Sequence, residues 1–181
     1  MVTHLASKYA AQAMEYYVAA RYSALAGLSL VPGTLYHHAV EMMLKARLSE
    51  KHSTAELKAW GHNLQELWRV YLAERGNESL KQFHGTIQQL NAFEKIRFPE
   101  KMVSEGAQIS FAMEKGQRPK AKGESGRRLK VPTYHFAIQE LDSLMAELFA
   151  SSSLNPTAFL PQMRWGADEF FYRDNVRFRR K

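Results

Sequence analysis

Apolar residues recur every three or four positions along most of the chain, which is the period of an α-helix that buries one face. The first stripe of this kind runs from about His4 to Gly27. Further stripes follow Thr34, Asn63, Asn77 and Thr133, whose side chains can cap a helix by accepting a hydrogen bond from a free backbone N–H. The pattern therefore predicts five helices.

Glycine, proline and serine mark the joins between these stripes. Pro32 and Gly33 separate the first two, and Gly76 stops the third. Pro99 ends the fourth because it disfavours helical geometry at the preceding residue. The serines at 151–153 end the fifth, and a short helix from about Ala167 to Arg173 follows, packing through Phe170 or Phe171. Short joins favour antiparallel neighbours, so we expect an all-α, up-and-down bundle of four to five helices with a short C-terminal helix.

The stretch 101–132 interrupts this pattern. Ile109, Phe111 and Met113 alternate with other residues, which is typical of a strand. Glycines and a proline then rule out a helix up to Pro132. We expect a loop excursion or a short β-hairpin whose second arm is Leu129 to Val131, within one domain that covers 1–181.

Composition narrows the class of protein. Hydrophobic residues make up 45% and charged residues 24%, which is typical of a folded globular chain and excludes intrinsic disorder. There is no cysteine, so disulfides and thiolate zinc sites are excluded. Lys8, Glu15 and Arg21 interrupt the first apolar stripe, which excludes a signal peptide or membrane span there. We therefore expect a cytoplasmic protein that does not enter membranes.

The net charge of +7 is concentrated in two places. Seven basic residues stand against two acidic ones from Glu114 to Lys130, and five against one from Arg173 to Lys181. Arg127 and Lys130 belong to the first of these segments, which contains no aromatic residue between Lys115 and Lys130. It is thus suited to contacting phosphates and lacks a platform on which bases could stack, although many such segments are simply solvated.

Three polar residues share one face of the second predicted helix. His37, Glu41 and Lys45 are spaced four apart, with His38 beside them. A polar binding site is one interpretation, and His37 with Glu41 could contribute to a metal site. A surface ladder of ion pairs is the other, which we favour because no third ligand stands at metal spacing. We expect no metal and no cofactor.

Two further residues stand at helix ends. His62 precedes the predicted cap Asn63, where an anion could approach the free N–H groups, although such a histidine is often only structural. Arg97 stands where the fourth helix ends. It is expected either to hold an acidic neighbour or to bind a phosphate.

The order of four motifs resembles the HEPN superfamily. They are YHHAVEMMLKARL, GHNLQELW, FEKIRFPE and NPTAFLPQMRWGADEFFYRDN, and the resemblance covers roughly Met14 to Asn175. It implies a four- or five-helix bundle that is often a homodimer. Members include nucleotide-binding partners of minimal nucleotidyltransferases, toxin components and metal-independent ribonucleases. The tripeptide RFP is similar to the Arg-Tyr-Pro of the branch that lacks nuclease activity.

The ribonuclease branch carries an arginine, four to six residues and then a histidine. Arg128 and His135 match this spacing, and the resemblance implies that His135 would transfer protons while Arg128 stabilises phosphate charge. Leu129 stands where that motif usually has a polar residue, and Pro132 interrupts the span.

These observations favour a HEPN-like binding module that engages a nucleotide, RNA or a nucleotidyltransferase-like partner, in a toxin-antitoxin or defence setting. Ligand or phosphate contacts are expected from the following residues: His37, Glu41, Lys45, His62, Arg97, Arg127 and Lys130. The alternatives are a metal-independent endoribonuclease that uses Arg128 and His135, and a structural adaptor.

We also expect a homodimer. The chain has more large aromatic side chains than a small bundle easily covers, and exposed aromatic patches usually mark an interface. The residues considered are Trp60, Trp68, Trp165, Tyr16, Tyr17, Phe170 and Phe171. A two-fold axis would also present two copies of the basic segment to one polyanion.

Overall fold

A computed structural model describes residues 3–75, 78–117, 131–164 and 166–178. Its elements are, in order, α1 (His4–Leu25), α2 (Leu30–Leu48), α3 (Thr54–Ala59), α4 (Leu64–Arg75), η1 (Glu78–Phe83), α5 (His84–Phe93), η2 (Glu94–Ile96), α6 (Pro99–Glu105), β1 (Gln108–Ala112), β2 (Thr133–Ala137), α7 (Ile138–Ser151), η3 (Pro156–Phe159) and α8 (Ala167–Tyr172). The expected helical bundle is confirmed, with a small two-stranded sheet added to it.

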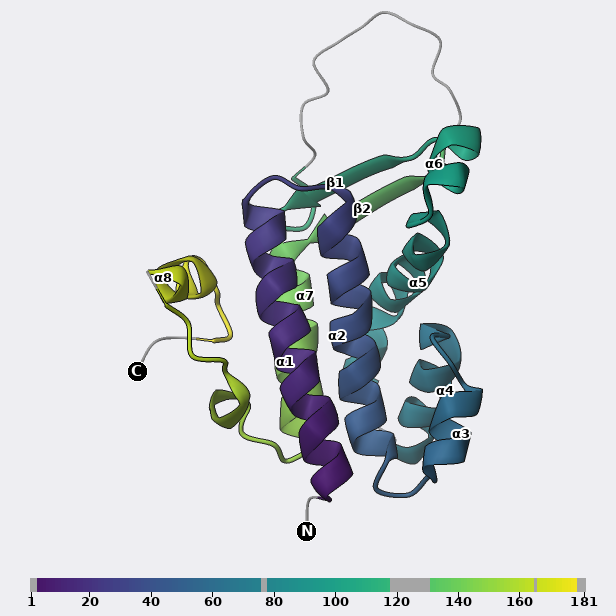
Figure 1. The fold of residues 1–181 in the computed structure, drawn as a ribbon, viewed down its shortest axis with the longest axis vertical. Coiled ribbons are helices and arrows are strands. Elements are labelled where there is room, and N and C mark those ends of the chain that lie inside the picture. The colour runs from purple at the N-terminus through teal and green to yellow at the C-terminus, as the bar shows by residue number, and fades with distance from the viewer. Residues whose placement is uncertain (1–2, 76–77, 118–130, 165, 179–181) are drawn as a thin grey trace, which may run out of the picture.

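Helix α2 is the central element of the bundle. It packs along α1 on one side and against α4, α5 and α7 on others (Figure 1). It begins at Leu30, so Thr34 lies inside the helix and the prediction that Thr34 caps it is wrong. Pro32 fits the first turn, where its missing N–H has no partner to lose. Gly33 is required there because any Cβ would overlap the ring of Phe93.

The predicted cap at Asn63 is confirmed, and a further cap that was not predicted is present at Ser53. The side chain of Asn63 accepts a hydrogen bond from the backbone N–H of Glu66 at 3.2 Å, at the start of α4. Ser53 and Glu56 form a reciprocal capping box on α3. Asn77, the expected cap of the fourth helix, lies outside the described residues, and that helix begins as the 3₁₀ turn η1 before α5.

The stretch expected to be a loop or hairpin contains a helix and a strand. Helix α6 precedes β1, which pairs in parallel with β2. The prediction of an antiparallel hairpin is wrong, because parallel strands need a long connection and the sequence between Ala112 and Thr133 provides one. Thr133 opens a strand instead of capping a helix, so α7 starts only at Ile138.

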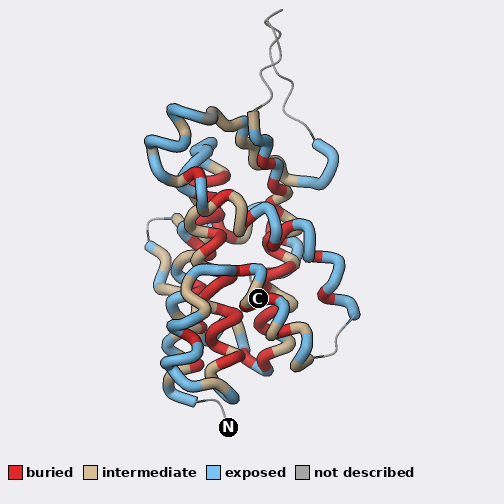
Figure 2. Tube along the Cα trace, turned by 90° about the vertical axis from the view of Figure 1, so that its right-hand side faces the viewer, coloured by how far each residue is buried: buried red, intermediate tan, exposed pale blue. Residues whose placement is uncertain are grey.

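Most large aromatic residues are part of the chain's own core. Buried positions, drawn in red, gather in the interior of the bundle (Figure 2). Tyr17, Trp68 and Phe171 are fully buried, whereas Phe170 is half exposed. Trp60 and Tyr16 are only partly buried, and Trp165 lies outside the described residues. The aromatic surface that was expected to form a dimer interface is therefore mostly covered already.

A buried ion pair fixes the C-terminal segment to the bundle. Arg21 on α1 donates from Nε to the carboxylate of Asp142 on α7 at 3.2 Å. The other two guanidinium nitrogens of Arg21 donate to the carbonyl oxygens of Phe170 and Arg173, at 3.0 and 2.7 Å. Tyr17 donates to the same carboxylate at 2.6 Å. Asn175 Nδ2 donates to the Tyr17 hydroxyl at 3.1 Å. We call Arg21, Asp142, Tyr17 and Asn175 the arginine cluster; it holds α8 against α1.

Among the described residues, no helix combines the length and apolar character that crossing a membrane requires.

Candidate functional site

A pocket of about 290 Å³ lies beside the sheet. Polar groups line it from four directions: η1 and α5, both strands, the turn after β1, and the first turn of α7. The polar lining residues are Gln82, Thr86, Gln89, Ser110, Glu114, Lys115, Gln117, His135 and Glu140. Its volume is close to the lower end of the range for small-molecule sites. We call it the His135 pocket.

The strand β2 directs His135 toward this pocket. Tyr134 and Phe136 point the other way, where both rings pack edge-on against Phe93. Side chains alternate along a strand, so His135 is left exposed on the opposite face. In the parallel register His135 lies opposite Ser110, and the Ser110 hydroxyl hydrogen-bonds to Nδ1 of its ring. This contact orients the imidazole and leaves Nε2 to meet a ligand.

A second set of hydrogen bonds connects the side chains that line the His135 pocket. Thr86 donates to Oε1 of Glu140 at 2.8 Å, and Lys115 Nζ lies 3.4 Å from the same oxygen. The backbone N–H of His135 donates to the side chain of Gln89 at 3.3 Å. Lys115 remains mostly exposed, so its charge also faces solvent at the mouth of the pocket. The pocket thus offers hydrogen-bond donors, an imidazole, an ammonium group and the carboxylates of Glu114 and Glu140.

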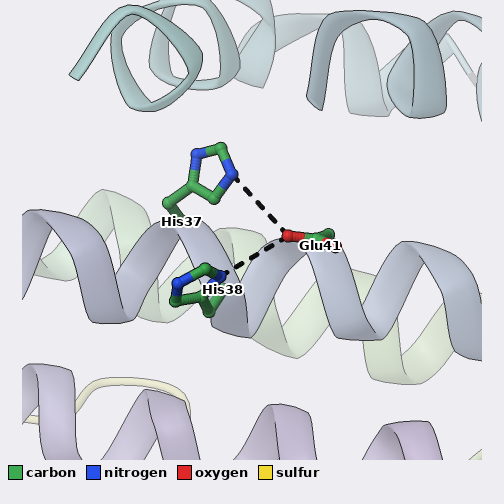
Figure 3. Close-up of side chains that lie close together, drawn as sticks. All are labelled: His37, His38 and Glu41. Carbon is green, nitrogen blue, oxygen red and sulfur yellow. Dashed lines mark ion pairs between the residues drawn. The ribbon is translucent and has the colours of Figure 1, made fainter. Parts of the chain in front are cut away.

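Four of the predicted ligand-binding residues lie on the other side of α5. His37, Lys45 and His62 come together around the carboxylate of Glu41, and His38 joins them. Figure 3 shows His37, His38 and Glu41. We call these five residues the Glu41 cluster. The side chains of His37 and Glu41 are fully buried. The favoured interpretation as a surface ladder is wrong, because α4 and α5 cover the face of α2 that carries them.

The two oxygens of Glu41 have different neighbours. Oε1 accepts a hydrogen bond from Lys45 Nζ at 2.7 Å, and the same ammonium group donates to the carbonyl of Gly61 at 2.8 Å. Oε2 faces three imidazoles: His62 Nδ1 at 2.9 Å, His38 Nδ1 at 3.5 Å and His37 Nε2 at 3.7 Å. Burial by itself would raise the pKa of Glu41, but His38, Lys45 and His62 together lower it to about 2.

His37 is held in one orientation by α5. Its Nδ1 lies 3.2 Å from the carbonyl of Leu90, which can only accept, so Nδ1 carries the proton. Burial lowers the pKa of His37, although Glu94 and Glu41 oppose this shift. The other ring nitrogen, Nε2, is buried and faces the carboxylate of Glu41. Within the described part of the chain, that buried nitrogen has no hydrogen-bond partner.

The remaining predicted residues are separate from both sites. Arg97 forms an ion pair with Glu94 and stacks over the ring of Phe98, 4.7 Å from its centroid. It therefore holds an acidic neighbour, which was one of its two expected roles. Arg127, Arg128 and Lys130 lie outside the described residues, so the expected approach of Arg128 to His135 lies outside them as well.

Sequence reasoning missed several pocket residues. Ser110, Gln89 and Glu140 approach His135 only through the parallel strand pair and its packing on α5 and α7. The alternation of Tyr134, His135 and Phe136 was the available signal for a strand, but the same apolar residues also fit a helical stripe.

In comparisons with known proteins, no family model matches this chain, and no curated protein or solved structure matches it either.

Proposed function

We propose that this chain is a HEPN-type module that binds the phosphate and sugar groups of a nucleotide, or of the nucleotide units in an RNA, in the His135 pocket. The observation that carries the proposal is an exposed, oriented imidazole in a polar pocket that continues directly in sequence into the basic segment. Gln117 lines the pocket, and the segment's first arginine is the next residue.

The chemistry of the pocket fits a phosphate ester. A phosphate oxygen accepts hydrogen bonds from an imidazole N–H, an ammonium group and backbone or amide N–H groups. His135 and Lys115 provide the first two, while Gln82 and Gln89 provide amide groups for a ribose or base edge. The carboxylate of Glu140 is already engaged by Thr86 and Lys115, which reduces its repulsion of an anion.

Charge and composition favour contact with phosphates over readout of base sequence. The segment from Glu114 to Lys130 has a net charge of +5 and no aromatic residue after Lys115 on which a base could stack. Binding should therefore depend strongly on salt and only weakly on sequence. The motifs that resemble HEPN domains support the same class of ligand.

Fluorescence anisotropy with a labelled single-stranded RNA, in buffer with EDTA, tests this function. His135→Ala should weaken binding about tenfold or more, because it removes a hydrogen bond to a charged group. The matched control is His84→Ala, since His84 is exposed on α5 and does not line the pocket. Competition by a free nucleotide shows whether the mononucleotide suffices. Equal affinity of the two variants would contradict the proposal.

A second function has a specific observation in its favour. The hydrogen bond from Ser110 orients His135 as a general acid or base requires, and metal-independent RNA cleavage needs such a group beside the ribose 2′-OH. Degradation of the labelled RNA in EDTA by the wild-type protein, abolished by His135→Gln, would identify an endoribonuclease. Intact RNA after prolonged incubation would assign the pocket to binding alone.

The proposed module is a homodimer, which would bring two basic segments to one polyanion. Exposed apolar side chains at the turn between α1 and α2, together with Phe98, supply contact surface; these are Leu28, Leu30 and Val31. Light scattering at micromolar concentration should return twice the 20.8 kDa of one chain. The mass of a single chain would refute the proposed dimer but would not test the proposed binding in the His135 pocket.

A further inference from the structure

In the Glu41 cluster, ligand atoms of His37, His38 and Glu41 lie within 4.8 Å of one another, and His62 Nδ1 lies 2.9 Å from Oε2 of Glu41. Three imidazole nitrogens, from His37, His38 and His62, face the single oxygen Oε2 of Glu41 (Figure 3 shows two of them). Lys45 occupies the other carboxylate oxygen, so Oε2 is directed at the imidazoles. Three histidines and one carboxylate are a ligand set that suits Zn²⁺ and similar transition-metal ions.

The orientation of His37 indicates a cation at this point. Its Nδ1 donates to the carbonyl of Leu90 at 3.2 Å, which leaves Nε2 facing the carboxylate of Glu41 at 3.7 Å. Nε2 is buried without a hydrogen-bond partner among the described residues, and a cation between it and the carboxylate would satisfy both groups. Metal-binding histidines characteristically donate their second ring N–H to a backbone carbonyl in this way.

The distances from Glu41 Oε2 to the three imidazole nitrogens are close to those between two ligands of a tetrahedral ion. With metal–ligand bonds of about 2.0–2.1 Å, two ligand atoms of a tetrahedral Zn²⁺ site lie about 3.3–3.4 Å apart. The distances from Glu41 Oε2 to the nitrogens of His62, His38 and His37 are 2.9, 3.5 and 3.7 Å, which bracket that value. The ligand atoms of His37, His38 and Glu41 all lie within 4.8 Å of one another, whereas His62 is not in this set, so its exposed ring would turn toward the ion on binding.

We propose that Glu41, His37, His38 and His62 bind one Zn²⁺-like ion, with Lys45 as the positioning residue that keeps Oε2 turned toward it. Burial decreases outward, from His37 and Glu41, fully buried, to His38 at 20% and His62 at 61% exposed. An ion can therefore enter from the side of His62. Four protein ligands complete a tetrahedral shell, so the ion ties the turn before α4 to α2 instead of activating a water molecule.

Spectroscopic titration of untagged, EDTA-treated protein with Co²⁺ tests the site, because tetrahedral Co²⁺ absorbs visibly and Zn²⁺ displaces it. The wild type should bind one equivalent per chain. His62→Ala should weaken binding about tenfold or more while the metal-free protein keeps its circular dichroism spectrum, since His62 is exposed. His84→Ala, a matched exposed histidine on α5, should bind as the wild type does.

Two outcomes would overturn the proposal. The first is the absence of any cobalt spectrum, and of any heat of Zn²⁺ binding, in the wild type at a large excess of metal. The second is equal affinity of the His62→Ala and His84→Ala variants, which would place the ion elsewhere. His38→Ala gives an independent test, because His38 lies on α2 and His62 lies before α4, yet both rings face the same carboxylate oxygen. The His38→Ala variant should lose affinity as well.

Discussion

The arginine cluster and the Glu41 cluster both bury charge inside the bundle, but they differ in how completely that charge is satisfied. Arg21 uses Nε on Asp142 and its two terminal nitrogens on backbone carbonyls, and Asp142 also accepts from Tyr17. In the Glu41 cluster, Glu41 and Lys45 are paired, whereas Nε2 of His37 has no hydrogen-bond partner within the described part of the chain.

The arginine cluster therefore stabilises the fold, whereas the Glu41 cluster can bind a ligand. All three guanidinium nitrogens of Arg21 donate within the chain and the side chain is fully buried, so the cluster attaches α8 to α1. An orphaned buried nitrogen costs free energy unless something binds it. The Glu41 cluster therefore retains binding capacity that the arginine cluster has used.

Breaking the arginine cluster should have the largest effect on stability. Asp142→Ala leaves Arg21 buried and unpaired, for which a loss of about 3–5 kcal/mol in the free energy of unfolding is expected. Urea denaturation followed by circular dichroism measures it. The double variant Arg21→Met with Asp142→Leu removes both charges and should recover most of the loss. A loss below about 1 kcal/mol for Asp142→Ala would show that the pair is not needed.

Zinc should stabilise the protein through the Glu41 cluster by a smaller amount. At a free Zn²⁺ concentration 100 times the dissociation constant, the expected gain is about 2.7 kcal/mol. Differential scanning calorimetry with and without Zn²⁺ measures the rise in melting temperature. Glu41→Gln should abolish that rise, whereas Asp142→Asn should lower stability yet keep it. If both variants respond to zinc alike, the two clusters do not differ as argued.

The His135 pocket should contribute to binding without contributing to stability. Its imidazole is exposed, so His135→Ala should change the free energy of unfolding by no more than about 0.5 kcal/mol while weakening RNA binding. Urea denaturation measures the change in stability, and fluorescence anisotropy on the same preparation measures the change in RNA binding. A large loss of stability would mean that the loss of binding reports unfolding and not a lost contact.

The smallest effect concerns the surface pair of His52 and Glu74, 2.6 Å apart. Hydrogen bonding to Glu74 raises the pKa of His52. A raised pKa stabilises the folded state fully below about pH 6.5 and less as the pH rises through the folded-state value. Because the pair is near the surface, the contribution should not exceed about 0.5 kcal/mol. Melting temperatures of wild type and His52→Gln should converge as the pH rises; parallel curves would contradict this.

Much of the fold could be predicted from local signals. The stripe from His4 to Gly27 and the cap at Asn63 appear in the structure nearly as expected, because helical period and capping depend on neighbours in sequence. Thr34 was wrongly predicted to be a cap because Pro32 was taken to lie before the helix. A proline breaks the interior of a helix but is accommodated in its first turn, which is where Pro32 lies. The parallel pairing of β1 with β2 depends on distant contacts and could not be read locally.

The candidate sites were harder to predict than the helices. The spacing of His37, Glu41 and Lys45 correctly placed them on one face, but nothing local indicated that α4 and α5 would cover that face. His62 contacts Glu41 across 21 positions in sequence. The spacing of residues along the second helix therefore could not indicate it as a further ligand. Ser110 and His135 are likewise distant in sequence.

The central claim is that a nucleotide or RNA binds at His135, at a place distinct from the Glu41 cluster. A long-range ¹H–¹⁵N spectrum of the histidine rings tests it most directly, with His135 and His62 assigned from their variants. Adding nucleotide or RNA in EDTA should move the ring signals of His135 and leave those of His37, His38 and His62 in place, whereas Zn²⁺ should do the reverse. An unmoved His135 signal at saturating ligand would contradict the account.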